Sequence, residues 1–244
     1  MDLLWVLSGL AILAVLWVLV DTKLKKIRAD TWQAFGSRLG LQYRANDDSI
    51  RDTLPDFHLF DRGEQRVFNN VLSGKLGDVP ILAVDYAYVP EKGRAGPPVE
   101  ITLVLLTSEA IDLPHFLIRP QSGWLEYVGL LLGGGVPNLE EFGTFFGGDD
   151  TDFEDDPKFS RRFILRGADT DAIRALFDGN LRQHFADIDR EELFCEGLGG
   201  RLLYYTNRAL DSAELQEFID EAQGILQELN AGPGRTVPGP ELSI

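Results

Sequence analysis

The longest apolar stretch of the chain stands at its beginning, LLWVLSGLAILAVLWVLV, and runs from Leu3 to Val20 without a charged residue. A helix of this length spans about 27 Å, close to the hydrocarbon thickness of a bilayer, about 30 Å. Trp5 and Trp17 lie near its two ends, where the amphipathic indole rings of membrane helices gather. The pattern predicts a transmembrane anchor over residues 1–22.

Two other interpretations of this stretch are a buried core helix and a cleaved signal peptide. A core helix usually keeps one polar face, and this stretch has none. A signal peptide begins with basic residues and ends at a small-x-small site. This chain begins with Met1 and Asp2, and Asp21 and Thr22 follow the apolar run. The sequence therefore favours a membrane span.

Basic residues directly after the apolar run predict its orientation. They are Lys23, Lys25, Lys26 and Arg28. Only Asp2 and the terminal amine precede the run, and basic residues that flank a span stay on the cytoplasmic side. We therefore expect a single-pass protein of the cell (inner) membrane with its N-terminus outside and its bulk in the cytoplasm. Residues 23–40 are expected to form a basic, amphipathic, membrane-proximal helix that ends at Gly40.

The clearest β-strand signals lie between residues 67 and 107. Residues 67–76 and 79–89 are strand-like and are joined by a Gly-Asp turn, and residues 101–106 are almost entirely apolar. Consecutive strands with such links predict an antiparallel meander. Asp85 interrupts an apolar strand, so it either faces solvent, caps a neighbouring loop or belongs to a site.

The last third of the chain alternates strands and short helices. The expected elements are a strand over 159–166, a helix over 171–177, a hairpin of 193–196 with 201–206, and an amphipathic helix that begins after Asp211 and Glu214. The fold class is thus α+β: an N-terminal transmembrane helix, then a soluble domain with an antiparallel β-meander, short helices and a C-terminal amphipathic helix. The soluble domain is expected over 41–229, with two subdomains (about 41–120 and 149–229) as a possible division. The Gly/Pro-rich tail, 230–244, is expected to be disordered.

The charge of the chain excludes one class of partner. The net charge is −16 and the isoelectric point is about 4.5, whereas phosphate backbones are bound by basic surfaces. We therefore expect no nucleic acid as partner. Cys195 is the single cysteine and lies in an apolar strand, which is typical of a buried, unreactive thiol in a reducing compartment.

Catalytic motifs are scarce. The histidines are His58, His115 and His184, and the chain contains no HExxH, CxxC or GxSxG motif. His58 and His115 lie in two similar pieces, LPDFHLF and LPHFLI, His184 lies on a short helix, and a pairing of Cys195 with a histidine in space stays open. We assign no catalytic residue and no cofactor, and the sequence favours a protein that is not an enzyme.

A glycine-rich segment, 119–148, contains several aromatic residues. No Lys-Ser/Thr pair follows the glycines, which argues against a phosphate-binding loop. A pocket beneath residues 124–148 would suit an enzyme or a small-ligand-binding domain.

Alternating carboxylates follow this segment and make Asp150, Asp152 and Glu154 weak candidates for a cation site. An EF-hand loop would need Gly at position six and Glu at position twelve, where Asp155 and Arg161 stand. We therefore expect a solvated acidic turn that is pinned by an inward-facing aromatic ring, Phe153.

The run FGGDDTDFEDDPKFSRRFILRGADTDAIRALF, from Phe146 to Phe177, together with the upstream LPHFLIRP, resembles motifs of an uncharacterised family of bacterial proteins with an N-terminal membrane segment. The resemblance implies one anchored α+β unit in a bacterial protein and carries no known activity. Taken together, the sequence predicts a membrane-tethered cytoplasmic interaction or scaffold domain. Its expected partners are the lipid bilayer and a protein.

Overall fold

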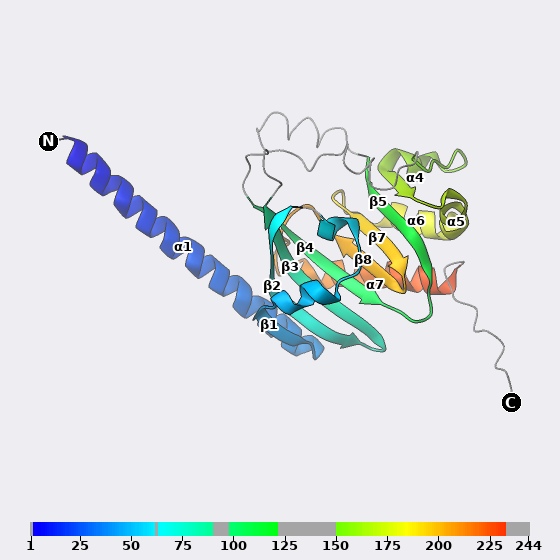
Figure 1. Ribbon diagram of the computed structural model, residues 1–244, viewed down its shortest axis with the longest axis horizontal. Coiled ribbons are helices and arrows are strands. Elements are labelled where there is room, and N and C mark those ends of the chain that lie inside the picture. The colour runs from blue at the N-terminus through cyan, green and yellow to red at the C-terminus, as the bar shows by residue number, and fades with distance from the viewer. Residues whose placement is uncertain (1, 62, 90–97, 122–149, 233–244) are drawn as a thin grey trace.

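The computed structural model describes residues 2–61, 63–89, 98–121 and 150–232 (Figure 1). The glycine- and aromatic-rich segment 124–148, and with it the pocket expected beneath it, lies outside the described residues. So does nearly all of the tail that was expected to be disordered.

Helix α1 (Asp2–Leu39) is continuous and projects far beyond the sheet (Figure 1). The predicted anchor and the predicted basic helix therefore form one helix. It ends at Gly40, whose φ of +72° is left-handed, as expected for a helix stop. The last turns of the helix pack on the domain through Trp32 and Phe35, which are both buried. Within the described residues, no helix meets both the length and the hydropathy of a membrane span.

A single antiparallel sheet of eight strands forms the centre of the domain. Its strands are β1 (Gln42–Asn46), β2 (Glu64–Leu76), β3 (Val79–Val89), β4 (Val99–Thr107), β5 (Leu113–Pro120), β6 (Phe163–Gly167), β7 (Phe194–Gly199) and β8 (Arg201–Tyr205). Their order is β1-β2-β3-β4-β8-β7-β5-β6, so strands from both halves of the domain share one sheet. The expected meander is confirmed, because β2, β3 and β4 are consecutive antiparallel neighbours.

Two apolar clusters cover the two faces of this sheet. The helices are η1 (Asp48–Thr53), η2 (His58–Asp61), α4 (Pro157–Arg162), α5 (Thr170–Leu176), α6 (Gly179–Asp187) and α7 (Leu215–Ala231). The end of α1 and helices α4 to α7 pack on one face, which we call the helix face. The segment that carries η1 and η2 covers the other face, which is rich in aromatic rings (Figure 1).

The expected start of one strand was wrong. The strand expected from residue 159 begins at Phe163, and Phe159 lies in helix α4 instead. The side chain of Asp156 accepts a hydrogen bond from the Phe159 amide at 3.1 Å, and Pro157 occupies the first turn. This cap stabilises a helix where apolar alternation indicated a strand.

Candidate functional site at the root of the N-terminal helix

The point where α1 meets the sheet is held by an ion pair between Arg28 and Asp85. Arg28 Nε donates to Asp85 Oδ2 at 2.6 Å and Arg28 Nη2 donates to Asp85 Oδ1 at 2.7 Å. This two-pronged geometry matches a guanidinium to a carboxylate and fixes both side chains. Arg28 Nη1 also donates to the carbonyl oxygen of Leu210 at 2.7 Å. One side chain thus ties α1 both to β3 and to the loop before α7.

Asp85 has two further donors, one from each neighbouring strand. Asn70 Nδ2 donates to Asp85 Oδ2 at 2.8 Å and Thr102 Oγ1 donates to Asp85 Oδ1 at 3.0 Å. Asn70 has a φ of +47° and lies where the β2–β3 register shifts, between Asn69 and Leu72. Such a bulge re-aims a side chain, and asparagine tolerates the left-handed conformation better than most residues. The carboxylate is therefore fully hydrogen-bonded although it is largely buried.

A groove opens beside this ion pair, between α1 and the sheet. Its volume is about 350 Å³, at the lower end of the range for small-molecule pockets, about 300–1,000 Å³. Lys25 and Arg28 line it from α1, Asn69 from β2, Asp85 from β3 and Glu100 from β4.

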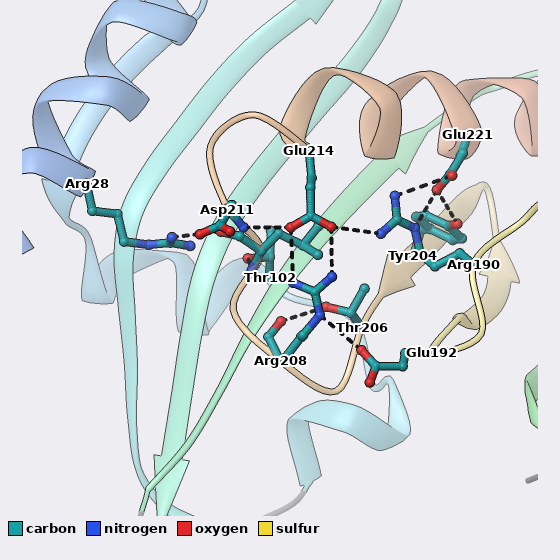
Figure 2. A network of polar contacts seen from close by, with 11 residues as sticks. Arg28, Thr102, Arg190, Glu192, Tyr204, Thr206, Arg208, Asp211, Glu214 and Glu221 are labelled. Atoms are coloured by element: carbon teal, nitrogen blue, oxygen red, sulfur yellow. Dashed lines mark hydrogen bonds and ion pairs between the residues drawn. The ribbon is translucent and has the colours of Figure 1, made fainter.

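The polar contacts continue from Arg28 toward the start of α7 (Figure 2). The amide of Leu210 donates to Thr102 Oγ1 at 2.9 Å, and the amide of Asp211 donates to Glu214 Oε2 at 2.9 Å. Arg208 Nη2 donates to Glu214 Oε1 at 2.7 Å. The loop between β8 and α7 is thereby held at several points.

This network shifts the pKa values of Arg28 and Glu214, among others. Burial alone lowers the pKa of Arg28, but the hydrogen bonds and the charge of Asp85 outweigh burial and raise it above its usual value. The hydrogen bond from Arg208 lowers the pKa of Glu214 to about 2. Both groups therefore keep their charges across the physiological pH range.

The other basic residues of the membrane-proximal cluster lie on the exposed surface of α1. Lys23 and Lys26 are exposed, and Lys25 forms an exposed ion pair with Asp21 at 2.9 Å. Of the four basic residues expected to act together, Arg28 thus bonds to the sheet and Lys25 lines the groove, whereas Lys23 and Lys26 do neither.

Four residues were expected to bound the membrane span. Trp17 and Val20 project from α1 away from the domain and are 71% and 56% exposed. Leu3 and Trp5 belong to α1 as well, and their side chains lie outside the described part of the chain.

A second buried carboxylate, Glu196 of β7, lies on the aromatic face of the sheet. Its Oε1 atom accepts a hydrogen bond from the backbone N–H of His58 at 2.7 Å and lies 2.7 Å from His115 Nε2. The two similar Leu-Pro pieces of the sequence therefore converge on one carboxylate. Burial raises the pKa of Glu196 above its usual value.

The possible pairing of Cys195 with a histidine of the Leu-Pro pieces does not occur. Cys195 belongs to the apolar cluster on the helix face, whereas the adjacent Glu196 points with His115 to the aromatic face. Cys195 is fully buried, and burial raises the pKa of its thiol well above the usual value. The expectation of a buried thiol is confirmed.

The acidic stretch is paired with arginines. Asp150 binds Arg166, and Arg174 donates to the backbone oxygen of Asp152 at 2.8 Å. Glu154 is exposed. Among the described residues, no three His, Cys, Asp or Glu side chains come together as metal ligands. The three cation-site candidates are therefore not brought to one point.

Phe153 packs inward, as expected. Only 6% of it is exposed, and its ring makes an edge contact with Phe159 at 5.7 Å between centroids. The guanidinium of Arg182 lies 4.3 Å from the centre of the Phe153 ring and also binds Asp155. The buried Phe153 ring holds the acidic stretch against the domain, while the carboxylates of the stretch stay at the surface.

Sequence reasoning identified Asp85 as a possible site residue but missed its partners. The Arg28–Asp85 contact joins positions 57 residues apart, and the His115–Glu196 contact joins positions 81 residues apart. A charged residue after Leu193, Phe194 and Cys195 was the only local signal for Glu196.

Comparisons with known proteins give a fold likeness alone. No protein-family model and no curated protein sequence matches the chain. A solved structure, that of the mycobacterial trehalose monomycolate transport factor A, TtfA, is similar with a TM-score of 0.56 and 12% sequence identity. The match covers 86% of this chain and 98% of that one. The resemblance to an uncharacterised bacterial family therefore stays a prediction.

Proposed function

We propose that this protein is a membrane-tethered accessory domain that is not an enzyme, held at the cytoplasmic surface by the apolar half of α1. More specifically, α1 crosses the membrane once, with its N-terminus outside. The α+β domain then serves as an interaction or scaffold surface beside a membrane protein.

The exposed apolar surface of α1 carries this proposal. Large apolar side chains on it are more than half exposed, and from Val15 to Val20 they follow one another without a gap: Leu7, Ile12, Leu13, Val15, Leu16, Trp17, Val18, Leu19 and Val20. Consecutive positions point to every side of a helix, so no single protein groove covers them all. A bilayer surrounds a helix completely, and it is the partner that suits this surface.

The fold likeness supports an accessory role. The protein with the similar fold is named as a transport factor for trehalose monomycolate. The described polar groups of the domain are engaged mainly in contacts that hold the fold together. A tethered domain of this kind suits a role beside membrane transport machinery. The alternative, an enzyme or ligand-binding domain with a pocket beneath residues 124–148, rests on a segment outside the described residues, and no observation favours it.

Membrane extraction tests the proposal. The full chain is expected to stay with membranes in high salt and in alkaline carbonate. The double variant Leu13→Glu with Leu16→Glu is expected to appear in the soluble fraction, because an acidic side chain in the centre of a span costs about 2.5–3.5 kcal/mol. Release of the unmodified chain by carbonate would contradict the proposal.

A matched control uses the same charge change in the half of α1 that lies on the domain. Ala34→Glu with Ser37→Glu alters two exposed positions, and this variant is expected to remain with the membrane. A reporter enzyme that is active only outside the cytoplasm, fused after Leu229, is expected to be inactive. Strong reporter activity would overturn the orientation.

A further inference from the structure

The groove beside Arg28 lies where the apolar half of α1 leaves the domain. Lys25 and Arg28 follow Val20 by about 7–12 Å along the helix axis, at 1.5 Å per residue. The headgroup layer of a bilayer is about 5–8 Å thick on each side. If Val20 marks the edge of the hydrocarbon, as the proposed function requires, the groove opens at the outer limit of this layer. Only a large headgroup, or a solute, reaches it there.

The charges of the groove disfavour an anionic ligand. Two cationic side chains, Lys25 and Arg28, face two anionic ones, Asp85 and Glu100, so the lining has no net charge. Both cations are already engaged, Lys25 by Asp21 and Arg28 by Asp85. A phosphate would have to displace these carboxylates or lie against Glu100.

Two hydrogen-bonding groups of the groove lining remain available for a ligand. The carboxylate of Glu100 and the amide nitrogen of Asn69 make no hydrogen bond to any described residue, although Asn69 Oδ1 is held by Asn46 at 3.4 Å. Together they present acceptors and a donor, which is what a hydroxyl group needs on its two sides. Four alanines, Ala29, Ala45, Ala87 and Ala209, leave the space open.

We propose that this groove binds a neutral, polyhydroxylated group, which is the chemistry of a sugar. The sugar is either the headgroup of a membrane glycolipid or a free saccharide. Arg28 and Asp85 are positioning residues in this proposal, because they hold α1 at the distance from the sheet that creates the groove.

The alanines provide the test, since their methyl groups report on the groove directly. The full chain is labelled with ¹³C-methyl alanine in phosphatidylcholine nanodiscs and titrated with maltose or with inorganic phosphate. Parallel discs contain a diglucosyl diacylglycerol or phosphatidylglycerol. We expect the methyl signals of Ala87 and Ala209 to shift with maltose or with the diglucosyl lipid. The signal of Ala110, which is exposed and outside the groove, is expected to stay unchanged.

A groove-filling variant tests the location. Ala87→Leu replaces none of the residues that hydrogen-bond in the Arg28–Asp85 site. It is expected to weaken binding roughly tenfold, about 1.4 kcal/mol, read at the methyl of Ala209. Ala209→Leu, read at Ala87, serves if the first variant fails to fold. Ala110→Leu is the matched control and is expected to bind normally.

The outcomes separate the sources and the two proposals. Shifts with maltose indicate a free saccharide, and shifts with the diglucosyl lipid alone indicate a headgroup. Shifts with phosphate or phosphatidylglycerol only, or no shifts with any ligand, would overturn the sugar proposal. Because maltose is soluble, the maltose titration can be carried out even if carbonate releases the chain from membranes. A wrong membrane proposal can therefore be told apart from a wrong sugar-binding proposal.

Discussion

Asp85, which is largely buried, and Glu196, which is fully buried, lie on opposite faces of the same sheet and are stabilised in different ways. The side chain of Asp85 is 12% exposed and receives two hydrogen bonds from the guanidinium of Arg28, besides those of Asn70 and Thr102. The side chain of Glu196 is fully buried and lies against the imidazole ring of His115.

The difference shows what a permanently charged partner does for a buried acid. Arg28 is protonated at every accessible pH, and its two hydrogen bonds to Asp85 hold a helix on the sheet. Glu196 lies against an imidazole ring and not a guanidinium, and burial raises the pKa of its carboxyl. We therefore interpret Asp85 as the residue that holds α1 on the sheet. Glu196 is interpreted as a core carboxyl group whose protonation affects stability.

The largest effect is expected for Glu196→Ala. This change removes the buried carboxylate that accepts from the His58 N–H and contacts the His115 ring, at a cost of about 3–5 kcal/mol in the free energy of unfolding. Urea unfolding measures it. Glu191→Ala, an exposed neighbour in sequence, is the control and is expected to change stability by less than about 0.5 kcal/mol. A loss below about 1 kcal/mol for Glu196→Ala would contradict this view of the core.

Asp85→Asn is expected to cost less, about 2–3 kcal/mol, because Arg28 loses a charged acceptor but stays partly solvated. In a double-mutant cycle, adding Arg28→Ala to Asp85→Ala is expected to cost much less than the sum of the single changes, since both remove the same contact. The matched control is Glu100→Gln on the neighbouring strand. Strict additivity would show that the two side chains do not depend on each other.

Glu196→Gln is expected to change the pH dependence of stability more than stability itself. The folded-state pKa of Glu196 is raised, so the folded state binds its proton more tightly than the unfolded state. The corresponding stabilisation is present below the unfolded pKa of about 4.5 and is lost as the pH rises through the folded pKa. Unfolding curves from acid to neutral pH are expected to lose this slope in Glu196→Gln, which retains an acceptor for His58. An unchanged slope would contradict the assignment.

The smallest effect is expected for exposed carboxylates. Asp150→Asn with Asp152→Asn removes one surface ion pair, to Arg166, and is expected to change stability by less than about 0.5 kcal/mol. Calcium is expected to leave the melting temperature unchanged, because these side chains are not brought to one point. A calcium-dependent rise that the double change abolishes would make the stretch a binding site.

Several features followed from local pattern alone. The meander of β2 to β4, the end of α1 at Gly40 and the burial of Phe153 and Cys195 were expected from alternation, a glycine stop and apolar context. Phe159 was misassigned because a helix cap from Asp156 outweighed the alternation. Local pattern reports what a short segment favours, and a single capping hydrogen bond is enough to change the outcome where two patterns compete.

The amino-acid sequence by itself determined the uncharged run from Leu3 to Val20, the basic cluster after it, the acidic balance and the strand-forming middle of the chain. These depend on composition and on short-range period, which are properties of neighbouring residues. The tertiary structure alone decided that Arg28 leaves the basic cluster to bind Asp85, that a groove opens beside them, and that two histidine-bearing pieces meet at Glu196. Such contacts arise when the strand order brings distant positions together, and no local period encodes which ones will meet.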